Sequence, residues 1–493
     1  MNSTASTSPD SSSAACAHPP VWQPVLLAAL AGGMGWGIRG QYGHETGAMI
    51  AGLLVSLVLV FLLCPQASLL PAARAVAFGT IAMGIGGSMT YGQTIGLTQN
   101  APLIGNWDAW RWGMLGLGIK GAIWIGFAGL FLGMGLGGVR YRSREILLLL
   151  LGMLALCAIG VWVLNSPHDP ANKILPRIYF SASWQWQPTA GAELKPRPEV
   201  WGGQLFALLG AWAWAGWLRR DRLARNLALW GMLGGIGFPI GQCLQSFHAW
   251  NPEVFKAGLW VTLDPAMNWW NWMETTFGAV MGASLGLGLW FNRRHIGPMS
   301  DTTDAPLRPF IEWVLVGIHV TMLVISEFTE IRWANALYDP GLIIAFIPMV
   351  AVAGGRWWPF LLALPITAVP ILGKTIQSLV YESHALGSVP GWLFYGALPL
   401  ALTTTAAIWF ARQLGRNLSG REYARRALLL AAWLYFGLNY AFFHFPWPWL
   451  KWTARTPNAI GFTVCVVGLT FACLTLGPYR PHAQGKSRNV ADA

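Results

Sequence analysis

The chain is expected to fold as an all-α, polytopic integral membrane protein. Hydrophobic residues make up 54% of its 493 residues and charged residues only 11%, and its mean hydropathy is +0.46. This composition is typical of membrane proteins and excludes an ordinary soluble multidomain enzyme. The apolar residues also occur in long runs, and a helix needs about 20 of them to cross the hydrocarbon core of a bilayer.

About fourteen apolar segments are predicted to be transmembrane helices, of which the tenth is the shortest. They leave one extramembrane segment of any length, 166–200, which is rich in Pro and Trp and too short for an independent domain. The predicted spans are 21–38, 45–64, 72–96, 110–138, 145–165, 201–218, 226–245, 268–291, 310–328, 341–355, 357–379, 391–411, 427–445 and 458–477.

The distribution of arginine predicts the orientation of these spans. The net charge of +12 is not concentrated in one basic patch, so we expect no nucleic-acid partner. Basic clusters in short loops mark the cytoplasmic side. Both termini are therefore expected in the cytoplasm, with the chain in a plasma membrane, taken to be a bacterial inner membrane. The clusters are Arg140, Arg142 and Arg144; Arg219, Arg220, Arg222 and Arg225; Arg293 and Arg294; Arg412, Arg416, Arg421, Arg425 and Arg426; and Arg480, Lys486 and Arg488.

Three similar segments indicate an internal duplication. The stretches "GGMGWGIRGQ", "GIGGSMTYGQ" and "GGIGFPIGQ" each end in Gly-Gln near the outer end of a predicted span. The first and third lie six spans apart and run in the same direction, which favours a parallel 6+6+2 arrangement. The predicted divisions are a disordered cytoplasmic tail (1–20), a first six-helix repeat (21–225), a second (226–411), two added helices (412–477) and a cytoplasmic tail (478–493).

The glycines in the spans predict two different structures. In "GAVMGASLG" (278–286) and "GLFLGMGLG" (129–137) they recur every fourth residue, a spacing that lets membrane helices pack closely. In the runs that end in Gly-Gln the spacing is irregular, so interrupted helices are expected there, as at the two prolines of "LPITAVPILGK". Interrupted spans at matching positions of two repeats are typical of a transporter binding site.

The ionisable residues within or beside the spans provide the candidate site. Lys120 and Glu274 are costly in lipid and are expected to face protein or water, either as a structural ion pair or as solute ligands. Glu274 is also a candidate to carry a coupling proton. Arg39, His44 and Glu45 are crowded at the outer boundary, which favours the mouth of a cavity.

Other polar residues near the same outer level complete the predicted binding site. Most of the 30 tryptophans are expected in the interfacial belt, with Trp269, Trp270 and Trp272 as candidates to line a vestibule. The predicted substrate-binding residues are Arg39, Gln41, His44, Glu45, Tyr91, Gln93, Lys120, Gln242, His248, Asn271, Trp272 and Glu274.

Motifs add little to this prediction. The sequence contains no nucleophile elbow, zinc-protease or P-loop signature, and its six cysteines are scattered. We therefore expect no disulfide, metal or cofactor. His44, His248, His384 and His444 could bind a metal only if the fold brought them together, whereas His319 is expected to be a packed, hydrogen-bonded residue.

Three classes of function are compatible with the sequence. The leading prediction is a transporter or flippase for an anionic, zwitterionic or carbohydrate-like solute, with membrane lipid as its other partner. The second is an integral-membrane transferase or hydrolase with an extracytoplasmic active site that uses His and Glu for acid-base chemistry. The third is a structural subunit of a membrane complex.

Overall fold

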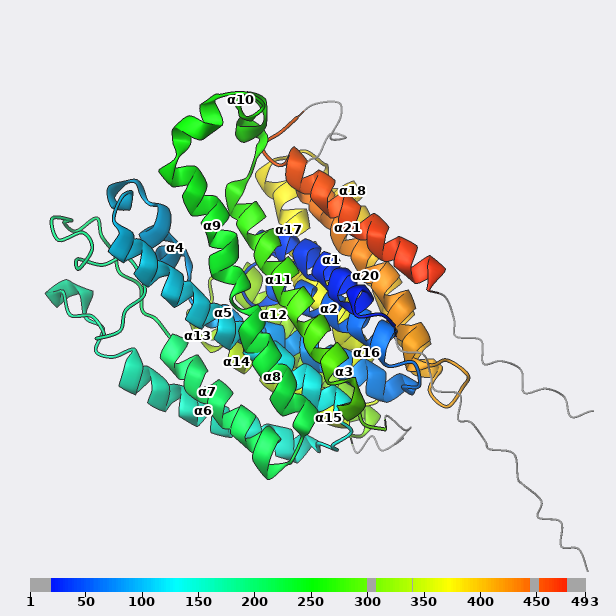
Figure 1. Ribbon diagram of the computed structural model, residues 1–493. Helices are drawn as coiled ribbons and strands as arrows, with labels where there is room; N and C mark the ends of the chain where they lie inside the picture. Colours follow the sequence, from blue (N-terminus) through cyan, green and yellow to red (C-terminus); the bar gives the residue numbers. More distant parts are fainter. Residues whose placement is uncertain (1–18, 299–306, 339, 444–451, 477–493) are drawn as a thin grey trace, which may run out of the picture.

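The computed structural model is a bundle of helices (Figure 1) and describes residues 19–298, 307–338, 340–443 and 452–476. Most of the predicted N-terminal tail and all of the predicted C-terminal tail lie outside these ranges. The α-helices are α1 (Trp22–Arg39), α2 (Thr46–Leu63), α3 (Leu69–Ile85), α4 (Gly92–Gln99), α5 (Trp107–Leu136), α6 (Ser143–Leu164), α7 (Trp201–Ala213), α8 (Arg222–Gly234), α9 (Gly237–Trp250), α10 (Trp260–Leu263), α11 (Trp269–Phe291), α12 (Pro309–Phe328), α13 (Arg332–Tyr338), α14 (Gly341–Ile344), α15 (Phe346–Gly354), α16 (Trp358–Leu361), α17 (Thr367–Ile376), α18 (Ser388–Trp392), α19 (Leu398–Arg412), α20 (Gly420–Phe442) and α21 (Thr456–Thr475).

Shorter helical turns connect or extend these helices. All four π-helical turns of the described residues continue a neighbouring α-helix without a gap, and α16, η8, α17 and η9 together form one distorted helix. The 3₁₀ turns are η1 (Gly86–Ser88), η2 (Ala101–Leu103), η3 (Pro170–Asn172), η5 (Pro252–Lys256), η6 (Asp264–Ala266) and η7 (Arg293–His295), and the π-helical turns are η4 (Trp214–Leu218), η8 (Leu362–Ile366), η9 (Gln377–Glu382) and η10 (Leu393–Ala397).

The centre of the bundle is α2, in which every residue is buried. Its sequence is apolar on all sides, as expected of a helix that contacts protein all round. Helices α1, α3 and α20 pack around it. Figure 1 shows α6 and α7 at one edge of the bundle and α20 and α21 at the opposite edge.

Glycine brings two pairs of helices into backbone contact, as their spacing predicts. In α11, a Cβ atom at Gly278 or Gly282 would overlap the carbonyl oxygen of Gly32 or Ala28 in α1. In α5, a Cβ atom at Gly129 would likewise overlap a carbonyl oxygen of α8. Small residues at every fourth position thus allow the close approach that drives helix association in lipid, where the hydrophobic effect does not.

The predicted spans all coincide with helices, but fewer meet a strict test of length and hydropathy. Among the described residues nine helices are long and apolar enough to cross a membrane, or ten if α13 and α14–α15, bent by 81° at their junction, form one span. Helices α1, α7, α11 and α20 match predicted spans without belonging to this set. A multi-pass membrane protein is therefore supported, whereas fourteen spans and a 6+6+2 duplication stay predictions.

Only two of the three runs that end in Gly-Gln are interrupted. Helix α3 ends at Ile85, and α8 and α9 are separated by Gly235 and Ile236, as predicted. Helix α1, in contrast, continues through its glycines to Arg39, contrary to the prediction. The reason is the contact with α11, which uses the glycine face of α1 for packing, and intact backbone hydrogen bonds are strongly favoured where water is excluded. At Pro365 the helix is distorted into a π-helical turn but not broken.

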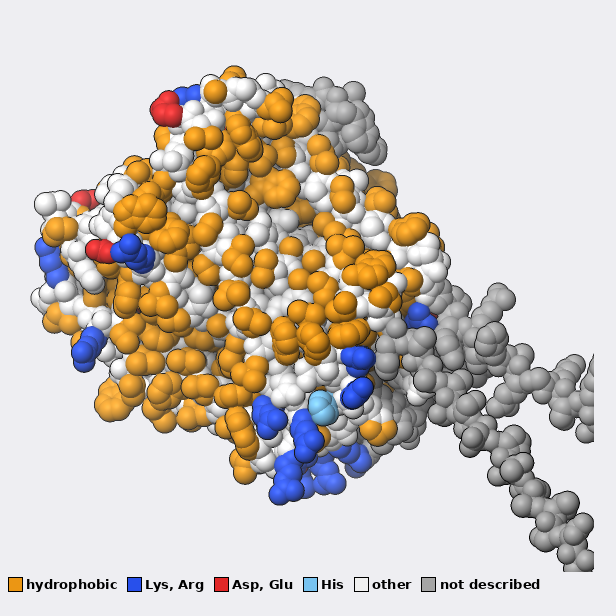
Figure 2. Space-filling view, viewed as in Figure 1, with side chains coloured by type: hydrophobic (Ala, Val, Ile, Leu, Met, Phe, Trp, Pro, Cys, Tyr) orange, Lys and Arg blue, Asp and Glu red, His pale blue; other side chains and the backbone are white. Residues whose placement is uncertain are grey.

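The outer surface carries a broad apolar area, and basic side chains gather toward one end of it (Figure 2). The exposed apolar residues include Leu148 and Trp162 on α6 and Phe310 on α12. Three consecutive basic residues form η7 directly after α11. An exposed apolar surface of this extent is compatible with contact to lipid.

The contact between α1 and α11 predicts the effect of enlarging a glycine. Gly282→Leu should lower the free energy of unfolding by about 1–3 kcal/mol or more, because its side chain would meet the backbone of α1. Gly317→Leu in α12 is the matched control, since a Cβ atom there meets nothing within 4 Å. Thermal unfolding of both variants in detergent measures the difference. Equal midpoints would contradict the packing role.

The predicted orientation can be tested at two exposed residues at opposite ends of α3. Asn417 lies close to Gly420, whose N–H binds the carbonyl of Ala67, just before α3 begins. Ala192 lies close to Lys195, whose carbonyl binds Gln93, just after α3 ends. With the native cysteines replaced, Ala192→Cys should react with an impermeant maleimide added to intact cells, whereas Asn417→Cys should react only after lysis. The reverse pattern would invert the predicted topology.

Candidate binding cavity

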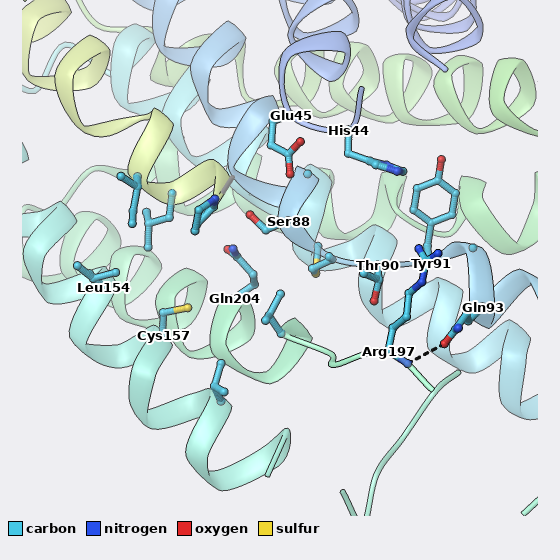
Figure 3. A pocket seen from close by; sticks show the side chains of 18 of the residues that line it. His44, Glu45, Ser88, Thr90, Tyr91, Gln93, Leu154, Cys157, Arg197 and Gln204 are labelled. Carbon is cyan, nitrogen blue, oxygen red and sulfur yellow. Dashed lines mark hydrogen bonds between the residues drawn. The ribbon is translucent and has the colours of Figure 1, made fainter. Parts of the chain in front are cut away.

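A cavity of about 930 Å³ lies between the segment that joins α3 to α4 and the helices α6, α7 and α14 (Figure 3). Its two sides differ in chemistry. The polar side contains His44, Glu45, Ser88, Thr90, Tyr91, Gln93, Arg197 and Gln204, and the apolar side contains Leu154, Cys157, Ala158 and Val161 of α6 with Leu342 and Ile343 of α14. A mostly apolar pocket with a few convergent polar groups is the usual form of a small-molecule site.

The polar side depends on a short non-helical segment, residues 89–91, between η1 and α4. It begins where α3 stops in a run of glycines, at which a Cβ atom on Gly86 or Gly87 would overlap Trp124 or the backbone at Glu45. Irregular backbone at membrane depth is tolerated where it is buried in protein or lines a cavity. Both conditions are met here, and the segment presents Thr90 and Tyr91 to the cavity.

A buried ion pair holds this segment from one side. Arg39, the last residue of α1, donates to Oε1 of Glu274 in α11 at 2.9 Å, and both side chains are at most 2% exposed. The Tyr91 hydroxyl accepts a hydrogen bond from Arg39 and donates to Glu274 Oε1 at 3.1 Å. Trp270 Nε1 also donates to this oxygen, at 3.2 Å. The carboxylate therefore has three donors, which satisfies the requirement that a buried charge be paired and hydrogen-bonded.

A second buried ion pair holds the segment from behind. Lys120 of α5 donates to Glu199 Oε1 at 2.6 Å, to the carbonyl oxygen of Thr90 at 2.6 Å and to Thr94 Oγ1 at 2.7 Å. Glu199 also accepts from Ser181 Oγ at 2.8 Å. The three protons of the ammonium group are thus all used, and the Glu199 carboxylate is one of the contacts that tie the segment 166–200 to the core.

The turn between α1 and α2 brings His44 and Glu45 to the cavity. Arg39 Nη1 lies 3.3 Å from His44 Nδ1. Since a guanidinium group can only donate, Nδ1 accepts and the ring N–H is on Nε2. Burial, followed by the charges of Arg39, Lys374 and Arg197, lowers the pKa of His44 to about 3. The imidazole is therefore neutral at physiological pH.

A third ion pair holds the start of α2 and the turn between α1 and α2. Lys374 Nζ in α17 lies 2.5 Å from Glu327 Oε2 in α12. Glu327 accepts from Thr46 Oγ1 at 2.9 Å, and Lys374 donates to the carbonyl oxygen of Tyr42 at 3.2 Å. Helices from the second half of the chain thereby position the turn that carries His44.

Two polar atoms at the cavity are left without a hydrogen-bond partner among the residues that the structure describes. They are Oε1 of Gln204, whose side chain is 2% exposed, and Oγ1 of Thr90. Figure 3 shows Gln204 between the polar side, at Ser88, and the apolar side, at Cys157. An unpaired buried polar group costs about 1–3 kcal/mol. Such a group at a cavity wall is a natural contact for a bound molecule.

The structure brings four of the twelve predicted site residues together at the cavity: His44, Glu45, Tyr91 and Gln93. Arg39 and Glu274 lie directly behind Tyr91, and Lys120 behind Thr90. Gln93 braces segment 166–200, since its amide binds the carbonyl of Lys195 at 2.9 Å and the N–H of Arg197 at 3.0 Å.

The other five predicted residues do not line this cavity. Gln242 donates to Thr98, Asn271 to the carbonyl oxygen of Gly37, and His248 lies 2.9 Å from Asp264. Gln41 pairs with Arg455 once its amide is oriented to accept from that guanidinium. The ring of Trp272 packs near Gly461.

Arg197, Glu199, Gln204, Ser88 and Thr90 were not predicted as site residues. Arg197 extends from segment 166–200 towards Thr90 and Tyr91 (Figure 3) and supplies a cation on the polar side. The need of Lys120 for a carboxylate partner is a sequence signal that points to the acidic residues of segment 166–200, but it does not select Glu199. Among the vestibule candidates, Trp270 lines the cavity. His444 lies outside the described residues.

No protein-family model, characterised protein or solved structure matches this chain. The case for function therefore depends on the geometry of the cavity.

The pairing of Lys120 predicts a structural phenotype. Lys120→Met should lower the free energy of unfolding by about 3–5 kcal/mol, because it leaves Glu199 buried without a counter-charge. The double variant with Glu199→Gln should recover part of the loss. Lys256→Met, which removes an exposed pair, should change the melting temperature little. A Lys120→Met protein with wild-type stability but no solute binding would instead make Lys120 a solute ligand.

Proposed function

We propose that the protein is a membrane transporter or flippase whose cavity, open to the extracytoplasmic side, binds an anionic, zwitterionic or carbohydrate-like solute. The observation that carries the proposal is the two-sided cavity inside a bundle of apolar helices. Arg197 supplies a positive charge, and Glu45, Ser88, Thr90 and Gln204 supply hydrogen-bonding groups. The size, about 930 Å³, suits a small organic molecule.

The interrupted helices support this assignment. The break after α3 forms part of the cavity wall, which is the place where transporters keep irregular backbone. We also propose fourteen spans in a parallel duplication. In that arrangement the break between α8 and α9 would lie in the second repeat, at a position related to a break in the first.

A coupling role for Glu274 would require the carboxylate to exchange its present partners. It now accepts hydrogen bonds from Arg39, Tyr91 and Trp270. In the resting arrangement Glu274 is therefore a positioning residue for Tyr91, and proton binding would accompany a rearrangement of this cluster.

An enzyme is the weaker alternative, although His44 and Glu45 both line the cavity. A neutral imidazole with a pKa near 3 has no imidazolium proton to give as a general acid at physiological pH and is a weak general base. Its Nδ1 atom is also occupied by Arg39. The environment of His44 thus favours hydrogen bonding over proton transfer.

Binding by purified protein tests the proposal. Inorganic phosphate, glycerol phosphate, glucose phosphate, succinate and glycine should be screened by thermal shift, and at least one anionic or zwitterionic compound should raise the melting temperature. Arg197→Gln should weaken its binding at least tenfold, because the cation on the polar side is lost. Arg111→Gln is the control, since that arginine forms an exposed pair away from the cavity.

Two outcomes would contradict the assignment. One is that none of these solutes shifts the melting temperature of the wild-type protein. The other is that Arg197→Gln and Arg111→Gln respond to every solute exactly as the wild type does, which would place binding outside the cavity.

A further inference from the structure

We infer that the cavity holds a lipid-like amphiphile, with a phosphate-bearing head on the polar side and a hydrocarbon chain along α6. This inference rests on the proposed function and narrows its substrate class. Two independent features of the cavity carry it, namely the unpaired polar atoms at the head end and the position of the apolar wall.

The head end has groups of opposite hydrogen-bonding character. Arg197 presents a guanidinium group, which suits a phosphate because it donates several hydrogen bonds in a fixed plane. The buried Oε1 atom of Gln204 accepts no hydrogen bond within the described structure, so it can receive one from a hydroxyl or amine of the ligand. Thr90 Oγ1 is likewise buried without a hydrogen-bond partner in the described structure. A phosphate next to a hydroxyl satisfies both kinds of group.

The apolar end is formed by one face of α6. Leu154, Cys157, Ala158 and Val161 recur at helical spacing and all line the cavity. The described residues of this side include no charged group, so a soluble phosphate would leave the side uncovered. A hydrocarbon chain would cover it and remove apolar surface from water.

Helix α6 both lines the cavity and contributes to the outer surface. Only 28% of the residues in the most apolar stretch of α6 are buried inside the protein, whereas all those of α2 are buried. Leu151 and Trp162, on the neighbouring face of α6, are 48% and 75% exposed. The chain-binding side is thus one helix away from lipid, whereas the head-binding side is backed by α2, α5 and α11.

The test compares a ligand with its own head group. Lysophosphatidylglycerol has a phosphate, hydroxyls and one acyl chain, whereas glycerol phosphate has the head alone. Binding of the first is measured by native mass spectrometry of the detergent-solubilised protein, and binding of the second by calorimetry. We expect lysophosphatidylglycerol to bind at least tenfold more tightly. Equal affinities would overturn the lipid inference and leave the proposed function standing, while failure of both to bind would also remove phosphate-bearing solutes from that proposal.

Two alanines of α6 provide matched variants. Ala158→Trp fills the apolar side of the cavity and should weaken lysophosphatidylglycerol at least tenfold, with glycerol phosphate affected less than twofold. Ala155→Trp adds the same ring to an exposed position of α6 that is not part of the lining, and should change neither. Equal effects of the two variants on the lipid would mean that it binds the outer surface only, and would overturn the inference.

Gln204→Leu tests the head group in the same assay. Loss of the acceptor should weaken lysophosphatidylglycerol about three- to tenfold, the range expected for one hydrogen bond. The native thiol of Cys157 supplies a reading on the unmodified protein, because the bound chain should slow its alkylation while the exposed Cys243 reacts as before. Unchanged alkylation of Cys157 at saturating lipid would contradict the placement of the chain.

Discussion

Every feature of the cavity depends on the pairing of charge inside an apolar bundle. An unpaired ion is too costly to bury, so Arg39 and Lys120 each require a carboxylate. Their partners, Glu274 and Glu199, come from distant parts of the chain. Both cations also bind the segment after α3, one at the Tyr91 hydroxyl and the other at the Thr90 carbonyl. The hydrogen bonds that satisfy the two buried cations therefore also fix the polar wall of the cavity.

The same requirement explains how segment 166–200 becomes part of the cavity wall. Lys120 cannot be buried unless Glu199 enters the bundle, and Glu199 brings segment 166–200 with it. Arg197, two residues away, is then held over the cavity, with its N–H bound to Gln93. A cation at the mouth of the cavity thus follows from a carboxylate in the core. The chain can place Arg197 accurately although its own segment contains little regular structure.

The sequence predicted the helices better than the contacts between them. Apolar runs mark helices because the bilayer sets their length. The four-residue spacing of Gly278 and Gly282 predicted a close contact between helices. The same composition misled at α1, because glycine favours either a break or a close contact, and only the partner helix decides which. Of the residues that line the cavity, the sequence singled out His44 because it lies beside a predicted span and Tyr91 because it lies near the end of one. Glu199 was not singled out, because its partner is 79 residues away and no local pattern encodes that pairing.

The unequal packing of the two walls bears on how such a cavity would open. Separating Arg39 from Glu274, or Lys120 from Glu199, would strand a buried charge at about 3–5 kcal/mol each. Among the described residues, the wall made by α6 shows no comparable ion pair at the cavity, and it offers apolar side chains to it. Apolar contacts can be exchanged for lipid contacts at little cost, because lipid tails are as apolar as leucine. Movement of α6 against a fixed polar wall would therefore leave both buried ion pairs intact.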